Sequence, residues 1–442
     1  MSNAKPTAPL NILVLYDRGA ISTEFVRQHL ESIRIHSKHN VHYLGATFGA
    51  NSATPVDLFD AVIIHFSVRL AYDWHISPHF VEQVKRFSGA KILMIQDEYE
   101  MPETACGWVR QLGIQTVFTC VPENCREKFY PADQVPGVEF VQVFTGYLPD
   151  ELPDPSQIKP LAERPIHLGY RGRKLPVWFG SLGYEKYKIG PHMRAACEQR
   201  SIPSDIEWSE GKRFTGPEWY EFLGRCRAVL GTESGSNVVD KTGSIRAAIK
   251  EASGRNPKLS EAELYNEFVR PHDGEVQMNQ ISPKTFEAAA MKTALIHFEG
   301  EYSGLLKPHE HFIPLRKDFA NIDFVLERLA DVAELQAMAE RTYKALCQPA
   351  KYGYQVFIAK VDAAVERNCR RPKGGTWTYE AVRYQSGQQE WSVDTQDLPS
   401  SRPVPRAPLT GGFLRSAWLR IPVKIRAGLV PVIEQIMHRR RR

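Results

Sequence analysis

Short apolar runs of strand length alternate with amphipathic stretches in the first 120 residues, and this alternation constrains the fold more than any other feature. The predicted strands are Asn11–Tyr16, Ala61–His65, Lys91–Ile95 and Thr116–Cys120. Helices are predicted after the first strand and over Val81–Phe87 and Thr104–Leu112. Strands that alternate with helices form a parallel sheet with helices on both faces. The first part of the chain is therefore predicted to be an α/β domain.

A second α/β series follows the proline-rich segment 148–155, which reads as a linker. Its predicted strands are Ile166–Tyr170, Ala228–Leu230 and Ala294–Phe298, and its predicted helices are Gly190–Glu198, a short helix from Pro283, and Asp323–Leu346. The polar segment 241–274 has helical character without an apolar strand, so we interpret it as an insertion. A last helix is predicted over Tyr352–Asn368.

These elements predict four parts. An N-terminal Rossmann-like domain covers residues 1–150, and a second one covers 158–347 with the insertion at about 241–274. A C-terminal helix region follows at 348–384. Residues 385–442 are polar and rich in Ser, Pro and Gln at first and basic and amphipathic at the end, which predicts a flexible linker and a tail.

Composition excludes several classes of protein. The 442 residues are long enough for two or three domains, and a 43% hydrophobic content is ordinary for a globular protein. There is no apolar run of the roughly 18 residues that span a bilayer, and the start lacks a secretory pattern. Seven scattered cysteines indicate neither a disulfide framework nor a zinc site. We expect a cytoplasmic protein.

The net charge of +5 is concentrated in the tail. From Arg402 onward ten Lys or Arg residues face one acid, Glu434, so the tail carries +9 and the rest of the chain −4. A mildly acidic body argues against nucleic acid as the partner. Residues 413–442 mix Trp, Leu and Ile with Arg and Lys, which suits an anionic membrane surface such as the inner face of the plasma membrane. A plain basic tail is the alternative.

The segment from Gln280 to Phe298 is the strongest functional signal. Ser282 is placed to cap a helix whose first residue is Pro283, and the helix leads into a buried strand. The free N–H groups at such a helix start attract phosphate, which makes Ser282 and Thr285 binding candidates. Glu287 lies one turn deeper, where a carboxylate can accept hydrogen bonds from ribose hydroxyls. Together these residues outline a nucleotide-sugar site.

Cationic side chains follow the first strand of the second series, where ligands of open α/β sheets bind. Arg171, Arg173 and Lys186 stand between glycines and are candidates for holding a diphosphate, whose negative charge grows as the sugar leaves. A solvated basic loop is the alternative interpretation.

Two polar loops complete the donor side of the predicted site. Gly231–Asn237 follows a predicted strand and offers Glu233, Ser234 and Asn237 to a sugar or base, although a capped tight turn explains the same residues. Tyr302 and Ser303, after the strand at 294, are candidates because this segment resembles a recurring feature of bacterial glycosyltransferase-like proteins; backbone amides there could meet the sugar or the phosphates.

The first domain is expected to supply the acceptor side. Asp97 and Glu98 follow the strand Lys91–Ile95, and either carboxylate is a candidate base for an attacking hydroxyl. His65, at another strand end, is a third candidate. The alternatives are a helix-capping carboxylate and a satisfied structural histidine. No metal site is expected, because His309–His311 lie in a loop and no Asp-x-Asp pair stands at a strand end.

The segment Ser282–Ala290, followed by Phe298–Ser303, resembles the donor-binding segment of glycosyltransferases of the GT-B fold. Such enzymes often carry two glutamates eight positions apart here; Glu287 matches the second, and Asn279 stands at the first. The resemblance implies two Rossmann-like domains facing each other across a cleft, a last helix that crosses back to the first domain, and a metal-independent, hexosyltransferase-like reaction.

The expected function is therefore transfer of a sugar from a nucleoside-diphosphate sugar to a hydroxyl acceptor, a saccharide or glycolipid of the bacterial surface. Two alternatives stay open. One is a non-catalytic GT-B-like protein that binds sugar nucleotides or acts as a scaffold, and the other is a sugar-nucleotide epimerase.

Overall fold

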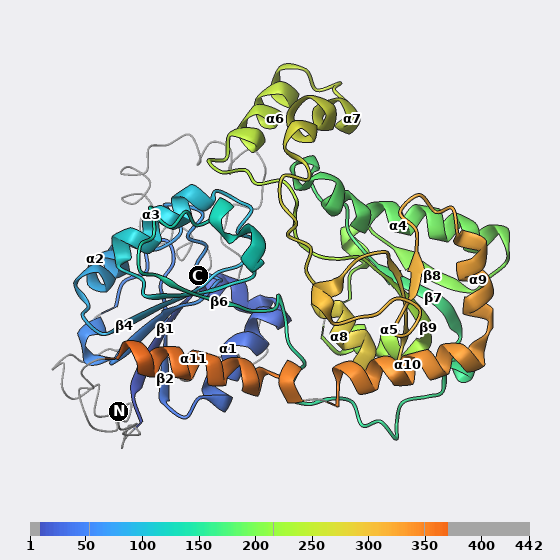
Figure 1. The fold of residues 1–442 in the computed structure, drawn as a ribbon, viewed down its shortest axis with the longest axis horizontal. Coiled ribbons are helices and arrows are strands. Elements are labelled where there is room, and N and C mark those ends of the chain that lie inside the picture. Colours follow the sequence, from blue (N-terminus) through green and yellow to red (C-terminus); the bar gives the residue numbers. More distant parts are fainter. Residues whose placement is uncertain (1–8, 53, 215, 349, 370–442) are drawn as a thin grey trace, which may run out of the picture.

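Two parallel β-sheets organise the computed structural model, which describes residues 9–369 except 53, 215 and 349 (Figure 1). The N-terminal sheet has six strands in the order β2-β1-β3-β4-β5-β6. Their bounds are β1 Asn11–Tyr16, β2 Asn40–Gly45, β3 Ala61–Ile64, β4 Ala90–Met94, β5 Thr116–Thr119 and β6 Glu139–Gln142. The inner strands β1, β3 and β4 are buried throughout, as a sheet covered on both faces requires.

Helices cover both faces of this sheet. They are α1 Glu24–His36, α2 Pro78–Arg86, α3 Pro102–Leu112 and, from the end of the described chain, α11 Tyr354–Asn368. One apolar core holds side chains of α2 and α3, and the other holds side chains of α1 and α11. In Figure 1 α11 runs back along the first domain after the chain has completed the second. The predicted last helix is thus observed, packed on the first domain.

The C-terminal sheet has five strands in the order β11-β10-β9-β7-β8. Their bounds are β7 Ile166–Arg171, β8 Ser204–Glu207, β9 Cys226–Gly231, β10 Ala294–Phe298 and β11 Ile313–Leu315. The helices are α4 Gly180–Gln199, α5 Pro217–Arg225, α8 Pro283–Ala290, α9 Ile322–Ala330 and α10 Val332–Leu346. The strand order reverses between β7 and β9, and ligands of open α/β sheets bind beyond the carboxyl ends of strands at such a point.

The segment predicted as an insertion forms a small helical unit at the top of Figure 1. It contains α6 Ser244–Arg255 and α7 Glu261–Leu264, which runs on into a single π-helical turn, Tyr265–Val269. It has an apolar core of its own that includes Ile249 and Leu264. Residues at its two roots, Val239 and Met278, pack into the core of the N-terminal domain, so the insertion bridges the two domains.

The predicted α/β class with two Rossmann-like domains, the GT-B arrangement, is confirmed, and residues of both domains line one cavity between them. Some element boundaries were wrong. The helix predicted from Gly190 begins at Gly180, because burial of Leu182, Ile189 and Met193 outweighs the glycines and Pro191. The helix predicted over Asp323–Leu346 is two helices that meet at Asp331.

The predicted linker and basic tail, residues 385–442, lie outside the described residues. Among the described helices none is long and apolar enough to cross a bilayer.

Candidate functional site

A cavity of about 230 Å³ opens at the point where the strand order of the C-terminal sheet reverses. Its floor is formed by the ends of β7 and β9, and His297 of β10 lines it as well. Gly231 lets the ring of His297 lie against the end of β9, since a Cβ atom there would stand 2.2 Å from its Nε2. We call this space the cationic cavity for the side chains that surround it.

Five positively charged side chains line the cationic cavity, and none of the described residues that line it is an aspartate or a glutamate. The five are Arg171, Arg173, Lys186, Arg213 and Lys284. Carboxylates outside the lining already pair with two of the five, Asp205 with Arg171 at 2.8 Å and Glu210 with Arg213 at 2.6 Å. Arg173, Lys186 and Lys284 still give the cavity an excess of positive charge, which suits an anionic ligand.

The two lysines show the strain of this arrangement. Burial, with the repulsion of Arg173 and Lys284 added, lowers the pKa of Lys186 to about 8. The protein packed around Lys284 lowers its pKa to about 8 although the residue is exposed; Glu287 opposes the shift, and Arg213 and Arg173 add to it. An anion in the cavity would favour the charged form of both amines.

Arg171 is held by contacts within the protein. Its guanidinium is buried, forms an ion pair with Asp205 at 2.8 Å and lies over the rings of Phe214 and Phe222. Contact of its guanidinium with a diphosphate therefore stays a prediction, one that would require Arg171 to exchange its bonds with Asp205 for bonds with the ligand. Its main-chain oxygen accepts a hydrogen bond from Lys284 Nζ at 2.6 Å and so orients that lysine.

Arg173 and Lys186, the other two residues predicted to hold a diphosphate, line the cavity. Arg173 is exposed, and its guanidinium has no hydrogen bond or ion pair within the described part of the chain. Lys186 projects from α4, and its Nζ lies 3.4 Å from Ser234 Oγ. The predicted loop around Lys186 is thus the first half of a helix, which holds the amine more firmly than a loop would.

The start of α8 points into the cationic cavity, where Ser282 and Thr285 line the wall. Ser282 occupies the N-cap position and Pro283 the first turn, as predicted, but the Ser282 hydroxyl makes no capping hydrogen bond. Pro283 has no N–H and Thr285 N donates to Ser282 O at 3.0 Å, so the Ser282 hydroxyl and the Lys284 N–H are the groups at this helix start that a ligand could bind.

Glu287 stands behind the cavity wall rather than in it. Its carboxylate accepts a hydrogen bond of 2.7 Å from Trp219 Nε1, and Trp219 lines the cavity. Burial raises the pKa of Glu287, although Trp219 and Lys284 oppose the shift. Contact of the Glu287 carboxylate with a ribose stays a prediction. It would require the carboxylate to keep its hydrogen bond with Trp219 while also binding the ribose, or to give that bond up.

The loop after β9 is held by its own side chains. Glu233 is buried, and its carboxylate accepts hydrogen bonds from the backbone N–H groups of Glu301 and Tyr302, at 3.1 and 2.7 Å, and from Asn279 Nδ2 at 2.6 Å. Asn237 in turn donates to Asn279 Oδ1 at 3.0 Å. Glu233 thus holds the loop after β10 and Asn237 holds the segment before α8, so direct contact of either side chain with a sugar stays a prediction that would require these bonds to be exchanged.

Of the three predicted hydroxyl residues in these loops, two are bonded within the protein and one lines a cavity. Tyr302 is fully buried and donates its OH to Phe298 O at 2.6 Å, and Ser303 Oγ accepts from Ile281 N at 3.0 Å. The side chains of Tyr302 and Ser303 therefore support the site from behind. Ser234 lines the neighbouring cavity.

That second cavity, of about 200 Å³, lies between the two domains and shares Arg173 and Lys186 with the cationic cavity. The N-terminal domain contributes Asp97, exposed after β4, and the C-terminal domain contributes Ser234. We call it the interdomain cavity. Its further lining is partly aromatic, with Phe25, Tyr99 and Phe179. A carboxylate and two cations thus meet in one space.

The other two candidate bases are corrected. Glu98 is buried and accepts hydrogen bonds from Thr119 Oγ1, Tyr130 OH and Cys120 N, and burial raises its pKa to about 7. His65 is fully buried between Ser67 and His29, and burial lowers its pKa well below the usual range. Neither side chain lines a cavity described above, so both belong to the interior of the first domain.

Sequence reasoning missed Lys284, Arg213 and Trp219. Lys284 follows Pro283 directly, so the argument that placed the start of α8 at a ligand applies to it as well. Nothing in the sequence links Arg213 and Trp219 to the cavity, because their approach depends on how α5 packs beside β7 and β9. No group of three His, Cys, Asp or Glu side chains suited to a metal occurs among the described residues.

Comparison with known proteins gives likenesses of structure alone, because no family model matches the chain and no curated protein matches it. HepE from Anabaena, solved with UDP, has a TM-score of 0.48 at 8% identity, covering 81% of this chain and 100% of its own. A DNA-modifying β-glucosyltransferase has a TM-score of 0.45 at 10% identity, covering 80% and 99%. TarM has a TM-score of 0.37 at 10% identity, covering 69% of this chain and 54% of its own. At these values the likeness concerns overall fold and carries nothing about chemistry.

Proposed function

We propose that this protein is a glycosyltransferase that moves a sugar from a nucleoside-diphosphate sugar to a hydroxyl acceptor. The observation that carries the proposal is the cationic cavity, with five cations and no acid among the described residues that line it, joined to the interdomain cavity through Arg173 and Lys186. A diphosphate carries the multiple negative charge that such a lining suits.

Lys186, Lys284 and Arg173 hold the diphosphate in this proposal. As the bond to the sugar breaks, negative charge grows on the leaving phosphate, and fixed cations that already surround it stabilise the transition state more than the ground state. The first N–H groups of α8 add partial positive charge on the same side. These groups supply the charge that a divalent ion would otherwise supply, so we expect the reaction to proceed without added metal.

The acceptor hydroxyl enters from the interdomain cavity. Asp97 is the candidate base, since it is the carboxylate that the first domain contributes to that cavity and it is open to solvent. A base works when it reaches the proton that it abstracts in the bound complex, which the cleft between the domains allows. Glu98 and His65 have no such access.

The setting follows from the sequence. We propose a saccharide or glycolipid acceptor of bacterial surface polysaccharide synthesis, and a cytoplasmic enzyme that contacts the inner face of the plasma membrane through residues 413–442. A basic amphipathic tail would bring the active site to a lipid-linked acceptor.

Calorimetric titration of the full chain with UDP, GDP and the corresponding monophosphates tests the donor site, in the presence and absence of EDTA. We expect a diphosphate to bind more tightly than its monophosphate, with no effect of EDTA. Incubation with nucleotide sugars, with and without saccharide acceptors, then tests the reaction. No binding of any nucleotide would favour the scaffold alternative, and an epimerised donor without acceptor would favour the epimerase.

A further inference from the structure

The turn that presents Asp97 has an unusual backbone. Asp97 and Met101 both lie in the left-handed region, with φ of 56° and 48°, and neither is glycine. A hydrogen bond of 3.0 Å from Glu100 N to Asp97 O closes the turn between them. Aspartate adopts this conformation more readily than most residues, but methionine rarely does, so the backbone of Met101 keeps it only where the surroundings impose it. The contacts that impose it are therefore of functional interest.

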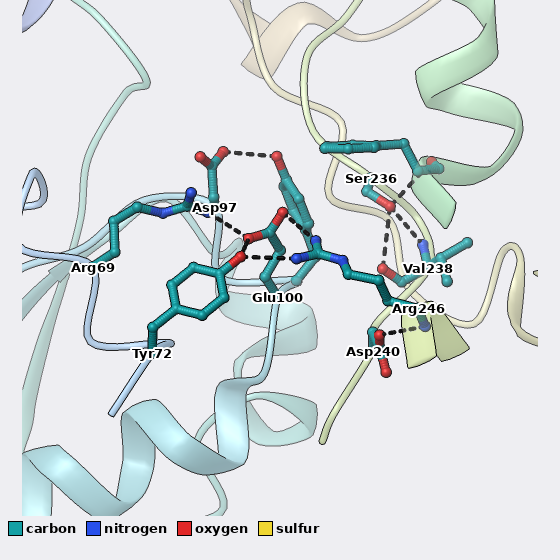
Figure 2. Close-up of polar contacts among 10 residues, drawn as sticks. Arg69, Tyr72, Asp97, Glu100, Ser236, Val238, Asp240 and Arg246 are labelled. Atoms are coloured by element: carbon teal, nitrogen blue, oxygen red, sulfur yellow. Dashed lines mark hydrogen bonds and ion pairs between the residues drawn. The ribbon is translucent and has the colours of Figure 1, made fainter. Parts of the chain in front are cut away.

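Glu100 lies inside this turn and is gripped from both domains, as Figure 2 shows. Its buried carboxylate forms ion pairs with Arg69 of the first domain and with Arg246 of α6 in the insertion, the latter at 2.6 Å. Tyr72 OH donates to the same carboxylate at 2.8 Å and accepts from Arg246 Nη1 at 2.8 Å. One carboxylate thus joins the loop after β3, the loop after β4 and the insertion.

The main chain repeats this connection. Met101 N donates to Asp240 O at 2.9 Å, and Asp240 N donates to Tyr99 O at 3.0 Å. The side chain of Asp240 accepts from the backbone N–H groups of Ile245 and Arg246, so it ties the same point to the start of α6. The Tyr99 hydroxyl in turn donates to Asp97 Oδ1 at 2.7 Å. An unbroken series of contacts runs from the insertion to the Asp97 carboxylate.

We propose that Arg246 is a positioning residue: through Glu100 it holds the strained 97–101 turn in place, so that Asp97 faces the interdomain cavity only while the insertion is docked on the first domain. The inference rests on the proposed role of Asp97. It assigns the insertion a task that neither α/β domain performs alone, since α6 reaches across to the domain that carries the base.

Hydrogen exchange of the full chain tests the proposal directly. In Arg246→Met we expect the amides of Glu100 and Met101 to exchange about tenfold faster or more, because the turn loses its cross-domain ion pair. Arg255→Met is the matched control, since Arg255 lies on the same helix and pairs only with Glu251 among the described residues. UDP affinity should stay within about twofold, because the cationic cavity does not include Arg246.

Activity supplies the second readout. Acceptor-dependent kcat should fall by about tenfold or more in Arg246→Met with the donor KM unchanged, and Arg246→Lys should restore part of it. Unchanged exchange in the turn, or faster exchange with unchanged transfer, would overturn the proposal. Hydrogen exchange shows whether Arg246 holds the turn even if the protein without substitutions transfers no sugar. Failure of this proposal can therefore be distinguished from failure of the proposed function.

Discussion

Lys284 is the residue whose removal tests the cationic cavity most sharply. It lies in the first turn of α8, and its amine is oriented by the main-chain oxygen of Arg171. We expect Lys284→Met to weaken diphosphate binding by roughly 1.5–3 kcal/mol, about tenfold to a hundredfold, since a charge-assisted hydrogen bond is lost. Lys188→Met is a suitable control: Lys188 lies on α4 and bonds to Lys317 O outside the cavity. Titration calorimetry measures both, and equal effects would remove Lys284 from the site.

The lowered pKa values of Lys186 and Lys284 predict a pH dependence of binding. Both fall from 10.5 to about 8, so both amines are charged at pH 7 and lose their protons as the pH rises through 8. Diphosphate affinity should therefore fall between about pH 7 and 9.5, and binding near pH 8 should take up protons, because the bound anion raises both pKa values. Calorimetry in buffers of different ionisation heat measures that proton uptake. An affinity that does not change with pH would contradict the prediction that these two amines bind the diphosphate in their charged form.

The lowered pKa values of Lys186 and Lys284 also predict how the free energy of unfolding changes with pH. Between about pH 8 and 10.5 the unfolded chain binds more protons at these two lysines than the folded protein does. The free energy of unfolding of the empty protein should therefore gain from these groups as the pH rises through that window. The double variant Lys186→Met, Lys284→Met should lack this contribution, which urea unfolding at pH 7.5 and 9.5 measures.

Neighbouring residues show where sequence reasoning about the site reaches its limit. Asp97 and Glu98 follow the same strand and have the same chemistry, yet Asp97 is exposed in a cavity and Glu98 is buried among three donors. Arg171 and Arg173 divide likewise: Arg171 is the last residue of β7 and is buried, whereas Arg173 lies beyond the strand and is exposed. The sequence predicts which loops meet at the site; which side chain of a loop faces it depends on packing.

At the level of elements, a substitution in α11 tests whether this last helix is anchored in the core of the first domain. Phe357 is buried between Tyr147, Phe118 and His29, with ring centroids 4.9, 6.0 and 5.0 Å away. We expect Phe357→Ala to lower the free energy of unfolding by about 3–5 kcal/mol, the usual cost of emptying such a position. Lys360→Ala, exposed on the same helix, should change it by less than about 0.5 kcal/mol. Chemical denaturation compares them; equal stabilities would mean that α11 is not anchored.

The strands that were predicted are those buried on both faces, such as β1, β3 and β10, whose runs are apolar without interruption. The edge strands were missed. β8 reads Ser-Asp-Ile-Glu and β6 reads Glu-Phe-Val-Gln, both partly exposed, so their sequences carry little of the apolar signal. β8 pairs with β7 and β6 pairs with β5, and no local sequence pattern predicts this pairing.

At the scale of the whole molecule the two domains divide the proposed chemistry, since the cationic cavity belongs to the second domain and Asp97 to the first. Asp97→Asn separates the two parts. Asparagine tolerates the left-handed conformation, and its side-chain oxygen can still accept from Tyr99, so the turn should survive. Diphosphate affinity should stay within about twofold, because the second domain is untouched.

Sugar transfer by Asp97→Asn should fall by about 10²- to 10⁴-fold, the usual contribution of a general base. Asp133→Asn, an exposed change elsewhere in the first domain, serves as the control and should leave both measurements unchanged. Titration and initial rates on the same preparations give the answer. Loss of nucleotide binding together with transfer would mean that the domains do not act separately, whereas full transfer would place the base elsewhere. The expected split, binding kept and transfer lost, follows from a cleft in which each domain brings one half of the reaction.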